Sequence, residues 1–247
     1  MLSKAQIKYI QSLQQKKYRL LSGHFVAEGD KIVQEMLAAA QPMEAVYATA
    51  PWMLQHRPLL DKVHRLEVNV VTEEELARIS SLTTPNQALA VLPIPGHAEP
   101  AAFREGVALA LEDIQDPGNM GTIIRIADWF GIAQIVCSPG CVDAYNPKTV
   151  QATMGSIARV KIVEAGLPEV LQHAGVASYA ATLHGKNIGD FEPITEGIIV
   201  IGNESRGLHP ATMALCTERV TIPRLGFAES LNAAVATGII CGRLLIR

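Results

Sequence analysis

The sequence is poor in aromatic residues and in cysteine, and it has no long uninterrupted apolar run. Aromatic side chains make up only 5% of its 247 residues, so few rings are available for stacking on nucleobases. The last apolar stretch, residues 231–246, contains Asn232 and Arg243 and is therefore not predicted to span a bilayer. These shortages argue against an integral membrane protein and against a surface built mainly of aromatic platforms.

The four cysteines show neither a metal site nor a disulfide framework. Cys137 and Cys141 are close in sequence, but no second pair and no nearby histidine completes a zinc set. Cys216 and Cys241 lie in apolar runs and are typical of small core residues. The N-terminal segment lacks the apolar region and the cleavage site of a signal peptide. We therefore expect a soluble, cytoplasmic protein without a membrane partner.

Charge is also scarce, at 18% of the residues, and the formal net charge is only −3. This balance argues against a protein whose whole surface binds polyanions, but it is compatible with a local basic patch. Residues 1–27 contain no Asp or Glu, and Tyr9, Tyr18 and His24 are interleaved with basic residues there. The pattern fits a nucleic-acid-facing surface and a solvated first helix equally well. The basic residues of this segment are Lys4, Lys8, Lys16, Lys17 and Arg19.

Proline divides the chain into two parts. Three prolines and a glycine fall within residues 92–100, where they disfavour both helix and sheet. We therefore assign residues 1–92 to a small α/β domain, residues 93–103 to a linker and residues 104–247 to a second domain. In the first domain, Thr72 and Glu75 have the spacing of a capping box and predict the start of a helix.

Short apolar runs alternate with helical segments in the second domain, which predicts an α/β fold with a mostly parallel sheet covered on both faces. Ligands of such sheets bind beyond the carboxyl ends of the strands. The predicted strands are residues 107–111, 134–137, 160–163, 178–181, 198–201 and 220–222. The predicted helices are residues 120–130, 167–174, 210–216 and 231–246.

A first polar cluster, residues 112–125, follows a predicted strand and opens a helix. Asn119 is predicted to be the N-cap of that helix. Arg125 stands among apolar residues, and a guanidinium in such surroundings needs a partner. That partner is either Asp128, three residues further along, or an anionic ligand, and the segment alone slightly favours Asp128.

A second cluster, residues 198–208, is a buried strand that ends in a loop bounded by Gly202 and Gly207. The glycines allow a close backbone approach to a ligand or a positive φ. The loop matches neither a dinucleotide-binding fingerprint nor a phosphate loop. The charged residues between the glycines, Glu204 and Arg206, could equally belong to an ordinary exposed turn.

A third cluster, residues 222–236, links the end of a strand to a long apolar helix. Ser230 is predicted to cap this helix. Asn232 is predicted at a buried position early in the helix, where an unpaired amide would be destabilising. We therefore expect Asn232 to contact a neighbouring loop or a ligand.

In this order and at this spacing, the three clusters resemble the signature motifs of the SpoU/TrmH branch of the SPOUT methyltransferases. Residues 146–148 and 152–156 also resemble a segment of that family. Residues 25–29 resemble the start of the ribosomal-protein-L30-like substrate-binding domain that precedes many members. The matching motif positions are Asn119 and Arg125, then Gly202, Glu204 and Gly207, then Ile222, Pro223, Ser230, Leu231 and Asn232.

The resemblance implies a C-terminal α/β sheet with a deep trefoil knot and S-adenosylmethionine as methyl donor for a ribose 2′-hydroxyl of RNA. It implies a donor pocket formed by Thr182, Leu183, Gly202, Asn203, Gly207, Ile222, Pro223 and Leu231. The implied catalytic residues are Arg125, Asn119, Glu204, Ser230 and Asn232. The resemblance and the positive charge of the side chains together suggest RNA contacts at Lys4, Lys16, Lys17, Arg19, Lys148 and Arg206.

Arg125 has been assigned as the base in this family, but an arginine is effectively always protonated. We expect it instead to bind phosphate and to stabilise the developing 2′-oxyanion, with Glu204 and Asn232 orienting the ribose or Arg125. No metal is expected, because the donor is itself a cation that loses its charge on transfer. We expect ribosomal RNA (23S) as the target ahead of transfer RNA, and a homodimer formed through the knotted domain.

Three other interpretations stay open. The chain could be a catalytically inactive RNA-binding protein of the same fold, although the matched polar positions are all present. It could be another transferase or a hydrolase on a doubly wound sheet, although the phosphate-loop and nucleophile-elbow patterns are missing. It could also methylate a base, as other members of the wider superfamily do.

Overall fold

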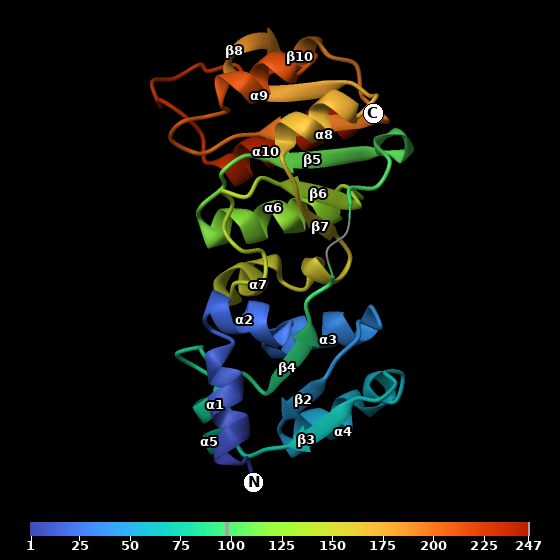
Figure 1. Cartoon of the computed structure of the whole chain (residues 1–247), viewed down its shortest axis with the longest axis vertical. Coiled ribbons are helices and arrows are strands. Elements are labelled where there is room, and N and C mark those ends of the chain that lie inside the picture. Colours follow the sequence, from blue (N-terminus) through green and yellow to red (C-terminus); the bar gives the residue numbers. More distant parts are fainter. Residues whose placement is uncertain (97–98, 247) are drawn as a thin grey trace. The chain divides into compact units, whose positions relative to one another are not determined.

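A computed structural model describes residues 1–96 and 99–246 of the chain, which form two compact units (Figure 1). Unit 1 comprises Met1–Gly96 together with Asp143–Ala158, and unit 2 comprises the remaining described residues. Each unit has a β-sheet of its own. The predicted linker, residues 93–103, includes residues 97 and 98, which lie outside the described residues.

The sheet of unit 1 has four strands in the order β1-β4-β2-β3. Strand β4 is antiparallel to both β1 and β2, whereas β2 and β3 are parallel. Side chains alternate along β4, so that Ala90 belongs to one apolar core and Leu89 and Val91 to another. The strands are β1 (His24–Glu28), β2 (Ala45–Ala48), β3 (Glu67–Val70) and β4 (Ala88–Pro93).

Helices cover both faces of this sheet. Met36 of α3 and Trp52 of α4 are buried in the core on one face, and Ile10 of α1 and Leu76 of α5 are buried in the core on the other. Unit 1 is therefore a three-layer α/β/α domain, which agrees with the small α/β domain predicted for this part of the chain. Its first five helices are α1 (Lys4–Ser12), α2 (Lys16–Ser22), α3 (Asp30–Ala38), α4 (Ala50–Leu60) and α5 (Glu73–Ile79).

The structure groups residues 143–158 with unit 1, although the sequence suggested that they belong to the C-terminal domain. This segment contains α7 (Pro147–Thr153), whose Val150 lies in the same apolar core as Phe25. The ring of Tyr145 packs on the ring of Phe25, with 4.9 Å between centroids. Apolar contacts with β1 thus hold the segment in unit 1.

One residue assigned to RNA binding, Arg19, is instead part of the interior of unit 1. Its side chain is only 1% exposed, and Nη1 donates to the carbonyl oxygens of Leu13 and Gln14 at 2.8 and 3.0 Å. Its Nε and Nη2 both donate to Asp143, at 3.1 and 2.5 Å. Because every polar edge of the guanidinium is used internally, the prediction that Arg19 contacts RNA is corrected.

The sheet of unit 2 has six strands in the order β10-β8-β9-β5-β6-β7, and every neighbouring pair is parallel. The predicted fold class, a parallel sheet in an α/β domain, is confirmed. The carboxyl ends of the strands therefore lie at the same edge of the sheet. The strands are β5 (Val107–Leu111), β6 (Gln134–Cys137), β7 (Lys161–Glu164), β8 (Ser178–Asn187), β9 (Gly197–Ile201) and β10 (Glu218–Thr221).

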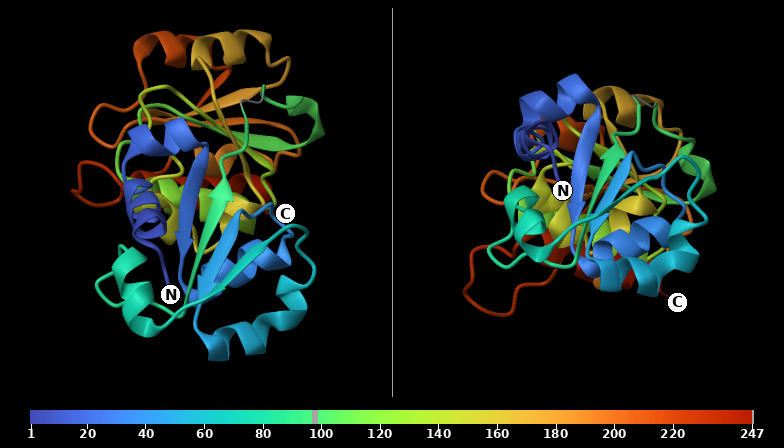
Figure 2. Two further views of the ribbon diagram at one scale, coloured as in Figure 1. Left: turned by 60° about the horizontal axis from the view of Figure 1, so that its bottom comes forward. Right: turned by 90° about the horizontal axis from the view of Figure 1, so that it is seen from below.

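Helices lie on both faces of this sheet as well (Figure 2). Helices α8 and α9 pack on one face, where Ala110 and Val200 of the strands share an apolar core with Leu171. On the other face, α6 and α10 pack against each other, and Gly238 of α10 lies beside Ile126 of α6. The helices are α6 (Pro117–Trp129), α8 (Leu167–His173), α9 (Pro210–Leu215) and α10 (Ala233–Leu245).

Two helices were not predicted. Helix α4 has a proline in its first turn and another, Pro58, inside it, and α7 also begins with a proline. Proline disfavours the helix interior, so the pattern around Pro58 resembled a loop, whereas α7 has only seven residues and shows no clear helical period. The predicted capping box is present, since the Thr72 hydroxyl accepts from the Glu75 N–H at 3.2 Å. Among the described residues, no helix is both long and apolar enough to traverse a bilayer.

Candidate active site at the carboxyl edge of the parallel sheet

The three polar clusters follow three strands of the same parallel sheet. The first begins after β5 and runs into α6, the second comprises most of β9 and the loop after it, and the third connects β10 to α10. Because these strands are parallel within one sheet, their carboxyl ends deliver all three clusters to one edge. Segments that are far apart in sequence are thereby brought together.

A chain of side-chain hydrogen bonds joins the three clusters. The Nδ2 group of Asn119 donates to Glu204 at 2.6 Å, and the Oδ1 atom of Asn119 accepts from Asn232 at 2.7 Å. Asn119 comes from α6, Glu204 from the loop after β9, and Asn232 from the start of α10. The structure thus brings together one predicted catalytic residue from each cluster.

The helix caps differ from those predicted. Helix α6 is capped by Asp116, whose carboxylate accepts from the Asn119 N–H at 2.8 Å, so Asn119 lies in the first turn. Helix α10 is capped by Asn232 and not by Ser230, because the amide oxygen of Asn232 accepts from the N–H groups of Ala234 and Val235. Asn232 is exposed, not buried as predicted. Capping leaves the Nδ2 group of Asn232 available for Asn119, and this agrees with the expectation that its amide contacts a neighbour.

Arg125 is an exposed residue in the middle of α6. It forms no hydrogen bond or ion pair with any other residue in 1–96 and 99–246. Its expected partner Asp128 is instead bound by Arg159, with Nε and Nη2 donating at 3.0 and 2.8 Å. The guanidinium of Arg125 is therefore available to an anionic ligand.

The loop after β9 is closed by its own backbone and by one buried amide. Asn203 and Gly207 exchange two backbone hydrogen bonds of 3.1 and 2.9 Å, and Gly207 has a positive φ of 69°. The Asn203 side chain donates to the carbonyl oxygen of Asp113 and accepts from the N–H groups of Ser205 and Arg206. These bonds hold the turn that presents the neighbouring Glu204.

The glycine at position 202 is required by this closure. A Cβ atom there would lie 2.4 Å from the carbonyl carbon of Gly207 and 2.5 Å from the nitrogen of Leu208. Such a distance is far inside van der Waals contact, so the loop would have to open. Gly202 thus allows a close backbone approach as predicted, and the backbone that it approaches is that of Gly207 and Leu208.

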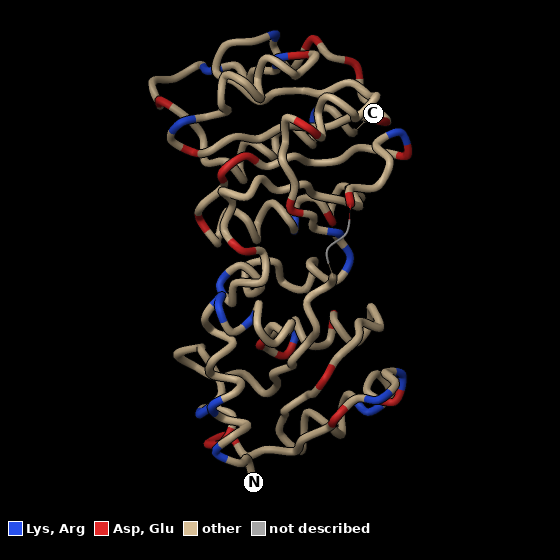
Figure 3. Tube along the Cα trace, viewed as in Figure 1, with Lys and Arg blue, Asp and Glu red and all other residues tan. Residues whose placement is uncertain are grey.

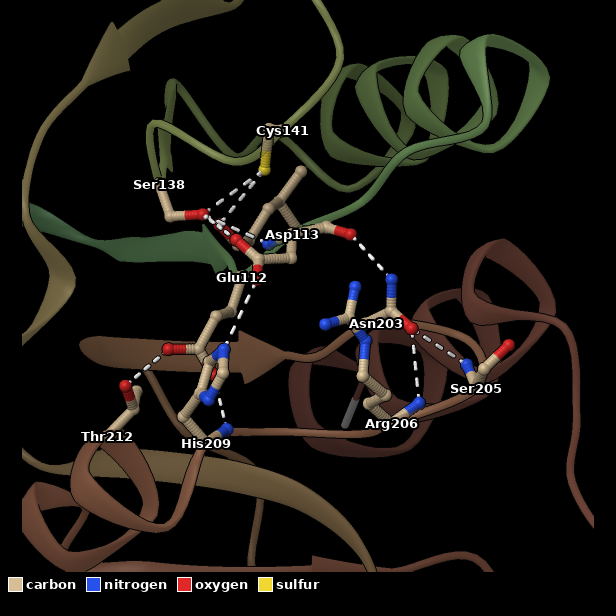
Figure 4. A network of polar contacts seen from close by, with 10 residues as sticks. Glu112, Asp113, Ser138, Cys141, Asn203, Ser205, Arg206, His209 and Thr212 are labelled. Carbon is tan, nitrogen blue, oxygen red and sulfur yellow. Dashed lines mark hydrogen bonds and ion pairs between the residues drawn. The ribbon is translucent and has the colours of Figure 1, made fainter.

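A polar network that the sequence did not reveal anchors the same edge (Figure 4). Asp113 has a positive φ of 55°, and its carboxylate accepts from the Ser138 hydroxyl at 2.9 Å and lies 3.2 Å from His209 Nε2. The buried carboxylate of Glu112 accepts from the His209 N–H at 2.6 Å and from the Thr212 hydroxyl. Consecutive acidic residues after a strand were the available signal, but it does not identify their partners.

Beside this network lies a cavity of about 220 Å³ that is lined by residues including Asp113, Arg206 and His209. Arg206 is exposed here, as its assignment to RNA binding requires. In the same network, the Cys141 thiol donates to the Leu111 carbonyl oxygen at 3.3 Å. A hydrogen bond from Cys137 is the main cause that lowers the pKa of Cys141 to about 7.

The loop after β10 is open. Leu225 and Phe227 are fully exposed, and Leu231 is 45% exposed. Ile222 is half-buried, whereas Pro223 and Ser230 are exposed. Its internal side-chain bond joins Arg224 to the Ala228 carbonyl oxygen at 3.4 Å. The predicted donor-binding residues of this loop therefore have few contacts with the rest of the described chain.

The predicted donor residues Thr182 and Leu183 lie inside β8, which extends further than the sequence suggested. They follow Ala180, the last residue of β8 that pairs with β9. The Thr182 hydroxyl donates to the His184 carbonyl oxygen at 3.0 Å, and Leu183 is 64% exposed. The strand register shifts in this region, between Arg219 and Val220 of β10.

The other residues assigned to RNA binding are exposed. Lys4, Lys16 and Lys17 lie on α1 and α2, and Lys148 lies on α7 of the same unit. In residues 1–96 and 99–246, no group of three or more His, Cys, Asp or Glu side chains is arranged to hold a metal ion.

Comparison with known families identifies the chain. Residues 106–242, more than half of the sequence, match the SpoU rRNA Methylase family. The chain belongs to the SpoU family. Its N-terminal residues 4–90 match the MRM3-like substrate binding domain. The family predicted from the three motifs is confirmed, as is a substrate-binding domain ahead of them.

Relatives of this SpoU-family chain align along almost its whole length. It is 29% identical over 240 residues to the 23S rRNA (guanosine(2553)-2′-O)-methyltransferase RlmP of Bacillus subtilis, covering 95% of this chain and 93% of the relative. A solved TrmH-family structure from Porphyromonas gingivalis has a TM-score of 0.87 and 38% identity, covering 99% and 98% of the two chains.

A third relative was solved with its methyl donor. The SpoU methyltransferase AviRb from Streptomyces viridochromogenes, in complex with AdoMet, has a TM-score of 0.83 and 26% identity. The alignment covers 98% of this chain and 97% of AviRb. The shared fold therefore includes both units of the chain, not the methylase part alone.

Proposed function

We propose that this SpoU-family chain transfers a methyl group from S-adenosylmethionine to a ribose 2′-hydroxyl of ribosomal RNA. The observation that carries the proposal is the hydrogen-bonded chain Glu204–Asn119–Asn232. It unites one residue of each motif, and α6 also carries the unpaired Arg125. An alternative interpretation, an inactive RNA-binding protein, does not explain why these polar groups converge.

The residues assigned to the donor fit a nucleoside. Leu183 and Leu231 expose 64% and 45% of their surface, so apolar area is available for an adenine ring. The backbone of the loop from Gly202 to Gly207 would supply polar contacts, together with Thr182 and residues 222–223. When bound, S-adenosylmethionine would supply the methyl group together with a positive charge that is lost on transfer, so the proposal includes no metal.

Arg125 would act on the RNA. Its exposed, unpaired guanidinium can bind a phosphate and donate to the oxygen that becomes negative as the 2′-hydroxyl reacts. Asn119 holds Glu204 and Asn232 in place, so these two would orient the ribose or Arg125 without paying for rearrangement during the reaction. Ser230, exposed on the open loop, would assist.

The proposed target is large-subunit ribosomal RNA, with transfer RNA as the second choice. Support comes from the Bacillus subtilis relative, whose name specifies 23S rRNA and 2′-O methylation, and from the MRM3-like substrate binding domain. This bacterial relative also supports the proposal that the chain acts in the cytoplasm. Residues 1–92 would bind the RNA substrate and residues 104–247 would carry the chemistry.

A homodimer is part of the proposal. Helices α6 and α10 pack together, and each exposes apolar side chains: Trp129 is 83% exposed, Val235 52% and Ile239 41%. Large exposed apolar side chains on packed helices support a protein interface there. The trefoil knot of the methylase domain stays a prediction from the family resemblance.

The first experiment is a calorimetric titration of the purified chain with S-adenosylmethionine. Wild type should bind saturably, and Leu231→Arg should not, because a charged side chain would replace apolar pocket surface. Leu54→Arg is the matched control, since Leu54 is an exposed leucine (77%) on α4 of unit 1. It makes the same change of charge and should bind like wild type.

The second step tests the chemistry. The chain is incubated with tritiated S-adenosylmethionine and an unmodified transcript of large-subunit ribosomal RNA, with a transfer RNA transcript in parallel. Alkali-resistant labelled dinucleotides would identify a 2′-O-methyl group, because ribose methylation blocks hydrolysis at that position. Donor binding without transfer to either RNA would contradict the proposed substrate, and no donor binding would favour the inactive RNA-binding protein.

A further inference from the structure

Helix α2 of unit 1 buries its arginine and exposes two leucines, which is the reverse of the usual arrangement. Arg19 points inward and is 1% exposed, whereas Leu20 and Leu21 are 68% and 73% exposed. The four hydrogen bonds of Arg19 hold the helix in this orientation. A helix normally buries its leucines, so the outer face of α2 presents apolar surface that the fold itself does not use.

An open groove of about 610 Å³ is lined by residues of α1 and by Gln15 and Tyr18 at the start of α2. Tyr9 and Tyr18 both line it, and they are 37% and 39% exposed. The ring of Tyr9 is held edge-on by His24, with 6.5 Å between centroids. In a chain with few aromatic residues, two half-exposed tyrosines in one groove form a platform on which flat groups can stack.

The charge that lines the groove is positive. The seven lining residues include Lys8 and no carboxylate, and Lys17 lies with its Nζ atom 5.9 Å from the centre of the Tyr18 ring. Lys4 and Lys16 lie on the same two helices (Figure 3). Glu44 contributes to the raised pKa of the Tyr9 hydroxyl, after burial as the larger cause, but it does not line the groove.

We propose that this groove binds an unpaired segment of the RNA substrate, with one base stacked on Tyr9, another on Tyr18, and the flanking phosphates on Lys8 and Lys17. The proposal rests on the function proposed above, which makes RNA the substrate. Aromatic rings select single-stranded RNA, because only unstacked bases expose their faces, whereas lysines alone would accept a duplex as well. Positive charge favours RNA over an apolar protein partner, which would not require the lysines.

The test measures RNA binding by the full-length chain. Fluorescence anisotropy is recorded with a short fluorescein-labelled oligouridylate and with an RNA duplex of the same length, each over a series of salt concentrations. Tyr18→Ala should weaken oligouridylate binding about tenfold, the typical loss for one stacked base, while Tyr18→Phe keeps the ring and binds like wild type. Lys8→Ala should weaken binding and lower the salt dependence by about one phosphate contact. Photocrosslinking of 4-thiouridine in the same oligomer should label Tyr9 or Tyr18.

Lys62→Ala is the matched control, because Lys62 is an exposed lysine of unit 1 that does not line the groove. If it reduced binding as much as Lys8→Ala, or if Tyr18→Ala bound like wild type, the proposed groove would be wrong. The rival hypothesis is that a second copy of the chain binds to Leu20 and Leu21, and light scattering of a Leu20→Ser, Leu21→Ser variant tests it. If this variant turned an oligomer into a monomer and bound RNA like wild type, the exposed leucines would belong to an interface between copies. Calorimetry with S-adenosylmethionine on the same proteins reports separately on the methyltransferase function.

Discussion

The loops after β9 and β10 leave the same edge of one parallel sheet, yet they are held very differently. The first, residues 202–208, is closed by two backbone hydrogen bonds between Asn203 and Gly207 and by the buried Asn203 amide. The second, residues 222–232, has Leu225 and Phe227 fully exposed. Both carry motif residues, so the difference concerns how each is positioned and not whether it belongs to the site.

The closed loop is held by the chain alone, whereas the open loop and Arg125 lack contacts that a ligand would supply. The closed loop presents Glu204 in its hydrogen bond to Asn119 without help from any bound molecule. The open loop exposes apolar side chains, and Arg125 on α6 also has no partner among residues 1–96 and 99–246. We expect the donor and the RNA to cover these groups, so variants of the closed loop should affect folding and variants of the open part should affect binding or rate.

The largest effect is expected at Arg125, which has no structural role in the described chain. Arg125→Ala should lower the rate of methyl transfer about 100-fold or more, as loss of a donor to a developing oxyanion typically does. Stability should change by no more than about 0.5 kcal/mol, because the side chain is exposed and unpaired. Single-turnover transfer from tritiated donor to the ribosomal RNA transcript measures the rate, and thermal unfolding measures stability.

Arg125→Lys sharpens this test, since it keeps a point charge but loses the planar fork of the guanidinium. An intermediate rate is expected. A lysine variant as fast as wild type would contradict the role of fork geometry, and an alanine variant close to wild type would remove Arg125 from the catalytic residues altogether.

The next effect, at Gly202, tests the closed loop. In Gly202→Ala the new methyl group would overlap the carbonyl carbon of Gly207, at 2.4 Å, and would force the loop open. We expect a loss of about 2–3 kcal/mol in the free energy of unfolding, in the range for overpacked sites. Urea denaturation followed by circular dichroism measures it. An alanine variant as stable as wild type would mean that the loop is not closed in solution.

The fold was largely predictable because its apolar runs are short and regularly separated. Val107–Leu111 and Gln134–Cys137 form the predicted strands at the predicted residues, since continuous runs of this kind are typical of strands buried on both faces. Helix α4 was missed because Pro58 in its interior resembles a loop signal, and α7 was missed because seven residues are too few for a clear helical period. Only the tertiary packing of Trp52 and Val150 reveals them as helices.

The site was predictable as a set of residues but not as a geometry. The order of the motifs indicated that Asn119, Glu204 and Asn232 belong together, and the sheet brings them into hydrogen-bond contact. Composition could not distinguish Arg19 from the exposed lysines near it, because its burial depends on Asp143, distant in sequence. Nor could it choose between Ser230 and Asn232 as the cap of α10, since both residue types are good N-caps.

A smaller effect is expected from replacing polar side chains in the two loops. Asn203→Ala removes three hydrogen bonds of a buried amide and should cost about 2 kcal/mol of stability. Ser230→Ala, the equivalent change in the open loop, should stay within about 0.5 kcal/mol. Hydrogen exchange provides a local readout, because the Ser205 and Arg206 amides lose their acceptor only in the Asn203 variant. If both changes lowered the free energy of unfolding equally, the two loops would not differ in how firmly they are held.

The smallest effect is expected at Gly226, the open-loop counterpart of Gly202. A Cβ atom there has no atom within 4 Å, and its φ lies outside the left-handed range. Gly226→Ala should therefore change the free energy of unfolding by no more than about 0.5 kcal/mol, with a slight gain if the less flexible unfolded chain dominates. On the same sample, urea denaturation measures the stability of the variant and calorimetry measures its binding of S-adenosylmethionine. Destabilisation as large as that of Gly202→Ala would show that residues 222–232 are packed, against the structure. If stability were unchanged but donor binding were weaker, the loop would have to adopt, when it binds S-adenosylmethionine, a backbone conformation that glycine allows and alanine does not.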